Sequence, residues 1–213
     1  DEGVSAILDT LERCGLRDNT IVVFTSDHGD FAGEHMMMAK GGAFFDCLAK
    51  VPLIVACPER TPRRIDVHAP VSSLDVVPTL LALQGLEVPE RIDGRGLPEI
   101  TSDPARSVVF SEYGAGADAF TLGDLSRQAA RSGRPAVAES LKRREWEGQR
   151  MMACDGRWKY VHDPSGDLDE LYDLESDPGE LFNLFREARH SAVRERLRGE
   201  MRQWNPDAFH VVA

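Results

Sequence analysis

Residues 20–55 read TIVVFTSDHGDFAGEHMMMAKGGAFFDCLAKVPLIV, two apolar runs joined by a polar segment that is rich in glycine. The first run, residues 21–24, is followed by small polar residues and then by Asp27, His28 and Gly29. This pattern predicts a buried parallel strand that presents Asp27 and His28 at its carboxyl end. Because open α/β sheets bind ligands beyond the carboxyl ends of their strands, the adjacent carboxylate and imidazole predict a divalent-cation site.

Lys40 lies farther along the same stretch, directly before two glycines. An ammonium group beside glycines, which let the backbone approach closely, favours contact with a tetrahedral anion. Each residue also has a plainer interpretation, with Asp27 and His28 as a helix cap and a surface imidazole, and Lys40 as a solvated loop lysine. His35 either protonates a leaving group or makes a structural hydrogen bond in the loop.

The composition is that of a soluble globular protein: 213 residues, 42% hydrophobic and 29% charged, enough for one large or two modest domains. A net charge of −11 argues against nucleic acid and anionic membranes as partners, although an anionic substrate needs only a local positive site. No apolar run approaches the roughly 18 residues of a membrane-spanning helix. The four cysteines form no zinc-binding pattern, a disulfide framework is not expected, and Cys14 and Cys57 are expected to pack.

Helical spacing of apolar residues predicts an amphipathic helix before the first strand. Its stripe consists of Val4, Ile7, Leu8 and Leu11, and Gly15 ends it. We expect this stripe to lie on one face of the sheet.

A second buried strand is predicted at residues 51–56, and a helix closed by a glycine at residues 72–85. Asp75 falls in the first turn of that helix, where capping is a better interpretation than metal binding. A segment with several prolines and glycines, residues 87–104, then indicates a domain boundary.

The rest of the chain predicts short strands and one long helix. An Asp-Gly turn at residues 155–156 is a strong hairpin signal between strands at residues 151–154 and 157–161. A final helix is predicted at residues 186–204. Residues 114–149 are locally basic with few large apolar side chains, which fits either a lid that attracts an anionic substrate or a surface insertion, so their role stays open.

Taken together, these motifs resemble the sulfatase family of the alkaline phosphatase superfamily. The matching segments, in order, are SDHG at residues 26–29, GEH at 33–35, AK at 39–40, VPLIV at 51–55 and ELYDLESDPGELFNLF at 170–185. The resemblance implies that Asp27 and His28 bind a metal and that Lys40 contacts the sulfate. His28, where other members have asparagine, looks like the iduronate sulfatase, choline sulfatase and phosphonate monoester hydrolase branches.

The resemblance implies an α/β fold, namely part of an alkaline-phosphatase-like mixed sheet with flanking helices and a smaller C-terminal α+β subdomain with an antiparallel sheet. Residues 1–104 are expected to be the C-terminal part of the catalytic domain, and residues 105–213 the subdomain with the final helix. The implied cofactor is calcium, since hard oxygen ligands dominate such sites, and His28 is also compatible with manganese.

The family's nucleophile, a cysteine or serine in C/S-x-P/A-x-R that becomes formylglycine, has no match in this sequence, and neither has an early Asp-Asp pair for the metal. We therefore expect a fragment, inactive alone, of an enzyme whose formylglycine lies in an N-terminal part. The implied activity is metal-dependent hydrolysis of a small-molecule or glycan sulfate ester. A phosphonate or phosphate ester hydrolase and a non-catalytic remnant remain alternatives. The alcohol, the oligomeric state and the compartment, whether cytoplasmic, periplasmic or secreted, stay open.

Overall fold

The computed structural model describes residues 1–61, 64–114, 126–127, 129–131, 133, 150–163 and 168–206. Their backbone contacts divide the chain into two compact units. The first unit consists of residues 1–27 and 51–107, and the second of residues 28–50 and 108–213. The predicted division after residue 104 concerns the domains of the intact protein and stays a prediction.

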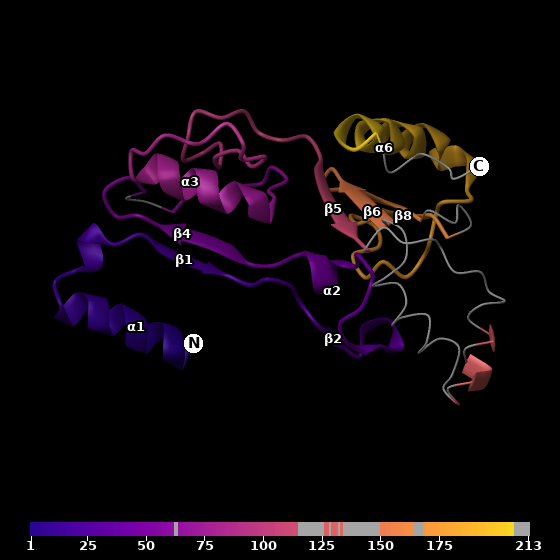
Figure 1. The fold of residues 1–213 in the computed structure, drawn as a ribbon, viewed down its shortest axis with the longest axis horizontal. Helices are drawn as coiled ribbons and strands as arrows, with labels where there is room; N and C mark the ends of the chain where they lie inside the picture. Colours follow the sequence, from indigo (N-terminus) through magenta and orange to yellow (C-terminus); the bar gives the residue numbers. More distant parts are fainter. Residues whose placement is uncertain are drawn as a thin grey trace. The chain divides into compact units, whose positions relative to one another are not determined.

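The first unit contains a pair of strands and two α-helices among its described residues (Figure 1). Its elements are α1 (Glu2–Arg13), η1 (Arg17–Asn19), β1 (Val22–Thr25), β4 (Leu53–Ala56), η3 (Ser73–Asp75) and α3 (Val76–Leu83). The predicted end of α1 is confirmed, since Gly15 follows it with a φ of 66°. Ile7 in its apolar stripe is 63% exposed, so the expected packing of this stripe on the sheet is not seen within the described part of this unit.

β1 and β4 pair antiparallel, with Val22 opposite Ala56 and Thr25 opposite Leu53. The prediction that β1 is a buried parallel strand is therefore wrong for the described chain. An apolar run indicates burial but carries no information on the direction of the neighbouring strand. Phe24 and its cross-strand partner Ile54 are 44% and 61% exposed, so this face of the strand pair is largely open.

Asp75 has the capping role that the sequence predicts, and it also forms an ion pair. Its carboxylate accepts hydrogen bonds from the Ser72 and Arg95 amides at 2.9 and 2.8 Å. The Arg106 guanidinium donates to both of its oxygens, at 2.7 and 3.2 Å. Burial raises the pKa of Asp75, but the Arg106 and backbone donors outweigh burial and hold the pKa below its ordinary value.

We expect Asp75→Asn to destabilise the protein by about 2 kcal/mol at pH 7, because the buried carboxylate is bonded to a charged partner. A carboxyl group whose pKa is lowered on folding contributes stability above its unfolded pKa of about 4, and this contribution is lost as the pH falls through the lowered pKa. Urea denaturation should therefore show that the difference in free energy of unfolding between wild type and variant shrinks below about pH 4.

Asp66→Asn is the matched control, since Asp66 pairs with Arg64 at 2.9 Å on the surface of the same unit. An exposed pair of this kind contributes at most about 1 kcal/mol. If the difference in free energy of unfolding between wild type and Asp75→Asn did not change with pH, the assigned role of the Asp75 charge would be contradicted.

The second unit is organised around an antiparallel sheet with the order β5-β6-β7-β8. Its strands are β2 (Phe31–Ala32), β3 (Met38–Ala39), β5 (Val109–Tyr113), β6 (Arg150–Cys154), β7 (Trp158–His162) and β8 (Glu170–Asp173). Its helices are η2 (Glu34–Met36), α2 (Asp46–Ala49), η4 (Ala188–His190) and α6 (Ser191–Trp204). β2 and β3 pair separately as a short antiparallel ladder. The hairpin predicted at residues 155–156 is confirmed as the β6–β7 connection.

The two faces of this sheet have different partners, because strand side chains alternate between faces. On one face, Met151 and Tyr160 form a core with Leu197 and Met201 of α6, which lies over the sheet in Figure 1. On the other face, Met152 and Val161 pack against Phe44, which comes from the stretch before α2. The sheet therefore supports the segment that follows Lys40.

The segment at residues 114–149, for which the sequence leaves a lid or a surface insertion open, lies almost entirely outside the described residues.

Among the helices that are described, none has both the length and the apolar composition needed to cross a bilayer. All four cysteines are free thiols. Cys57 is buried as expected, whereas Cys14 is exposed, so the prediction that Cys14 packs is wrong for the described residues.

Candidate functional site

The predicted ligands follow β1 directly. Asp27 is exposed and is the last residue of the first unit, and the Ser26 hydroxyl lies 3.4 Å from one of its carboxylate oxygens. His28 is half-buried and is the first residue of the second unit. The tip of the strand thus ends in one oxygen donor and one nitrogen donor on consecutive residues.

Gly29 fixes the backbone immediately after these ligands. Its amide donates to the Leu48 carbonyl at 2.8 Å, and a Cβ at this position would lie 2.0 Å from the Cys47 carbonyl oxygen. Glycine is required here because two backbone segments touch, rather than because the chain needs an unusual turn. Within the second unit, this close approach joins the residue after His28 to α2.

His28 and Lys40 are in direct contact. The His28 Nδ1 lies 2.8 Å from the Gly29 carbonyl oxygen, and its Nε2 lies 2.9 Å from the Lys40 Nζ. Because a carbonyl oxygen only accepts, Nδ1 is the protonated nitrogen, and Nε2 then accepts a hydrogen bond from the Lys40 ammonium. A neutral imidazole whose Nδ1 is held by a backbone carbonyl is the form that binds metals through Nε2, and because Nε2 has a single lone pair, a bound metal would take the place of the Lys40 hydrogen bond.

His35 lies in an aromatic cluster of the second unit. Its ring stacks on Phe45 with 3.7 Å between centroids and meets Phe31 edge-on at 6.2 Å. Its backbone adopts a φ of 51°, and the left-handed conformation recurs at Met36 and Ala39. A general-acid role for His35 stays a prediction, whereas its packing role is visible in these contacts.

Sequence reasoning missed two cations that hold the segment after Lys40. Arg150 and Lys159 are 2% and 1% exposed, and both bind backbone carbonyls between residues 42 and 44. The available signal was a charged residue at an inward position of an otherwise apolar strand, as in the Trp158-Lys159-Tyr160 run of β7. Such a charge must find a buried partner, which alternation alone cannot identify.

The donor set at the strand tip fits part of a metal site. Asp27 offers a carboxylate and His28 an imidazole nitrogen, ligands that calcium and manganese sites respectively accept. Across the part of the chain that the structure describes, no three His, Cys, Asp or Glu side chains gather in a metal-binding arrangement. Further ligands would have to come from elsewhere in the intact protein.

Two of the cysteines have environments that suppress reactivity. Burial raises the pKa of the Cys47 thiol, and burial likewise raises the pKa of the Cys154 thiol. A thiol with a raised pKa carries little thiolate at neutral pH and is a poor nucleophile. These two thiols therefore add no nucleophile to the candidate site.

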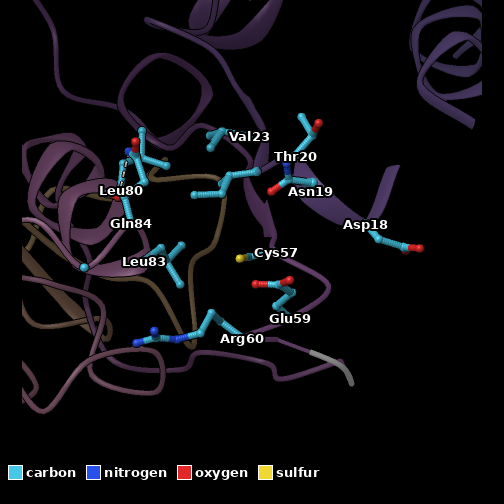
Figure 2. Close-up of a pocket in the computed structure, with 12 residues that line it drawn as sticks. Asp18, Asn19, Thr20, Val23, Cys57, Glu59, Arg60, Leu80, Leu83 and Gln84 are labelled. Carbon is cyan, nitrogen blue, oxygen red and sulfur yellow. Dashed lines mark hydrogen bonds between the residues drawn. The ribbon is translucent and has the colours of Figure 1, made fainter. Parts of the chain in front are cut away.

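A separate hollow of about 870 Å³ opens in the first unit, at the opposite end of β1 from Asp27. Figure 2 shows Val23, Leu80 and Leu83 among its apolar lining residues, with Glu59 and Arg60 nearby. Apart from Val23 in β1, its lining residues precede β1, follow β4, or lie in and just after the second half of α3. It therefore does not contribute to the predicted ligand site.

Comparisons with known proteins confirm the predicted resemblance to the sulfatase family. The family profile described as Sulfatase matches residues 1–86. A choline-sulfatase from Rhizobium meliloti is 35% identical over 98% of this chain and 36% of its own length. An N-acetylglucosamine-6-O-sulfatase from Bacteroides thetaiotaomicron is 30% identical over 92% of this chain and 32% of its own length. A phosphonate monoester hydrolase structure from Agrobacterium radiobacter superposes with a TM-score of 0.70 and 30% identity, covering 96% of this chain and 38% of that one.

These relatives place the chain in one class of protein, the alkaline phosphatase superfamily. Within that class, the chain belongs to the sulfatase family. It spans about a third of the length of the curated relatives it matches, 36% and 32% in the two cases above.

We expect Gly29→Ala to destabilise the protein by about 2 kcal/mol, because the added methyl group collides with backbone rather than with a movable side chain. Thermal unfolding of the intact protein measures the effect. The matched control is Gly199→Ala in α6, where a Cβ meets nothing within 4 Å and the change should stabilise the helix by about 0.5–1 kcal/mol. Equal effects at the two glycines would contradict the close-approach argument.

Proposed function

We propose that the intact protein is a metal-dependent hydrolase of sulfate esters, with Asp27 and His28 as metal ligands and Lys40 as a sulfate-binding residue. The observation that carries this proposal is the 2.9 Å contact between the His28 Nε2 and the Lys40 ammonium at the end of β1. An ammonium and an imidazole nitrogen are thus neighbours, and we assign the first to the anionic substrate and the second to a metal that would replace this contact when bound. Membership of the sulfatase family supports the same assignment.

The roles of this chain's residues follow from their chemistry. Asp27 and His28 would hold a metal, calcium or alternatively manganese, which when bound polarises the ester and activates the nucleophile. Lys40 would neutralise charge that grows on the transferring sulfuryl oxygens. His35 remains a candidate for protonating the leaving alcohol. The nucleophile, formylglycine by analogy with the family, would be supplied by another part of the intact protein.

The substrate class follows from relatives alone. The similar proteins include a choline-sulfatase and an N-acetylglucosamine-6-O-sulfatase, so a small-molecule or a glycan sulfate ester is the proposed substrate. A phosphonate ester hydrolase is the second candidate. The 30% identity and TM-score of 0.70 with a phosphonate monoester hydrolase favour it, and Asp27, His28 and Lys40 would serve either reaction.

Comparative hydrolysis of an aryl sulfate and an aryl phosphonate by the intact protein, with and without a chelator, tests the proposal. We expect sulfate turnover that the chelator abolishes and that added calcium restores. A preference for the phosphonate would reassign the reaction on the same residues. Absence of both turnovers would favour a non-catalytic sulfatase relative.

We expect Lys40→Ala to lower kcat for the aryl sulfate by about 10²–10³-fold, as for the loss of one charge-stabilising donor. Thermal unfolding should change little, because Lys40 is exposed. Lys50→Ala is the matched control, since Lys50 is 78% exposed and pairs only weakly with Asp46 at 3.6 Å. Wild-type kinetics in Lys40→Ala would remove Lys40 from the site.

A further inference from the structure

Two cationic side chains of the second unit, Arg150 and Lys159, are almost completely buried. Arg150 begins β6 and Lys159 lies in β7, and their residues are 2% and 1% exposed. Removing a charged group from water is strongly unfavourable unless its donors find partners. The partners of these cations therefore show which interactions the burial serves.

Lys159 uses all the hydrogen-bonding capacity of its ammonium. Its Nζ donates to the Phe44 carbonyl at 2.9 Å, to an Asp46 oxygen at 2.5 Å and to a Glu180 oxygen at 2.7 Å. The other Glu180 oxygen accepts the Asp46 amide at 2.5 Å. Lys159 and Glu180 thus hold the backbone and the side chain of Asp46 together.

Arg150 reaches the same segment from the neighbouring strand. Its Nη1 donates to the Gly42 carbonyl at 2.5 Å, while Asp163 and Glu170 accept from its other nitrogens at 2.8 and 3.2 Å. Gly42 and Phe44 have no ladder partners of their own, since they lie between β3 and α2. The two buried cations bind the carbonyls that regular structure leaves unsatisfied.

The backbone is held by other parts of the second unit on both sides of Lys40. On its N-terminal side, β3 pairs with β2, with Ala39 opposite Phe31. On its C-terminal side, residues 42–46, the anchored segment, are bound to the sheet by Arg150, Lys159 and Glu180. Because the backbone on both sides of Lys40 is restrained, the anchored segment determines where its ammonium can reach.

We infer that Arg150, Lys159 and Glu180 are positioning residues that hold the Lys40 loop in its active geometry. This inference rests on the proposed function of Lys40 as the sulfate-binding residue. Stability alone does not require buried cations, because apolar side chains of similar size often stabilise a core as well as a buried ion pair does. What the cations provide is a set of directed bonds to loop carbonyls, which apolar side chains cannot make.

A double-mutant cycle in the intact protein tests the inference, with kcat for an aryl sulfate as the readout. Lys159→Met should lower kcat roughly tenfold to a hundredfold in the wild-type background, as for a small displacement of a charge-stabilising group. In the Lys40→Ala background it should lower kcat only about twofold, because the residue being positioned is already absent. Equal reductions in the two backgrounds would overturn the positioning role.

Two further variants separate positioning from folding. Arg150→Lys keeps a positive charge but cannot bridge Gly42, Asp163 and Glu170 together, so it should also lower kcat. Arg157→Met is the matched control, since Arg157 pairs with Asp173 at 3.0 Å on the same sheet, is half exposed and lies outside the anchored segment's contacts. It should leave kcat unchanged even if it lowers the melting temperature.

Amide hydrogen exchange of residues 40–46 gives a readout that does not depend on turnover. Lys159→Met and Arg150→Lys should accelerate exchange in this peptide by about tenfold or more, whereas Arg157→Met should not. Unchanged exchange in both loop variants would overturn the inference even if the protein is a sulfatase. Conversely, an intact wild-type protein that hydrolyses no sulfate ester would refute the proposed function, while the exchange rates would still decide whether the sheet holds the loop.

Discussion

The second unit depends on one constraint, which is that an ammonium group shielded from water must bond all of its protons. Lys159 meets that constraint with the Phe44 carbonyl, Asp46 and Glu180. These bonds hold two parts of the chain, the anchored segment and the turn that contains Glu180, on one face of the β5–β8 sheet. Phe44 then packs against Met152 and Val161, so the polar bonds and the apolar contacts fix the same segment.

The C-terminal sheet would contribute to the proposed chemistry by holding the loop that carries Lys40. The proposed ligands Asp27 and His28 follow the end of β1, and Lys40 comes from a loop with little regular structure. A loop can place a charge accurately only if neighbouring rigid elements hold it. In this chain the rigid element is the antiparallel sheet, and its two buried cations make the connection.

Local signals predicted the parts of the structure that local chemistry controls. Gly15 ends α1, Asp75 caps the start of the α3 region, and the Asp-Gly turn joins β6 to β7. The direction of β1 and the role of Lys159 were not predictable in this way. Lys159 and Phe44 are 115 residues apart, and a strand pattern shows that a side chain points inward without showing what it meets. The roles of Asp27, His28, His35 and Lys40 stay predictions, because they concern a reaction rather than a fold.

The Lys40 loop is synthesised long before the residues that anchor it. Arg150 follows Gly42 by 108 residues. At translation speeds of about 5–20 residues per second, the loop waits roughly 5–20 s on the ribosome before its first anchor is made. During that interval the aromatic residues Phe44 and Phe45 have no sheet to cover them. Nascent-chain chaperones would therefore have their best opportunity to bind this stretch before the C-terminal sheet is complete.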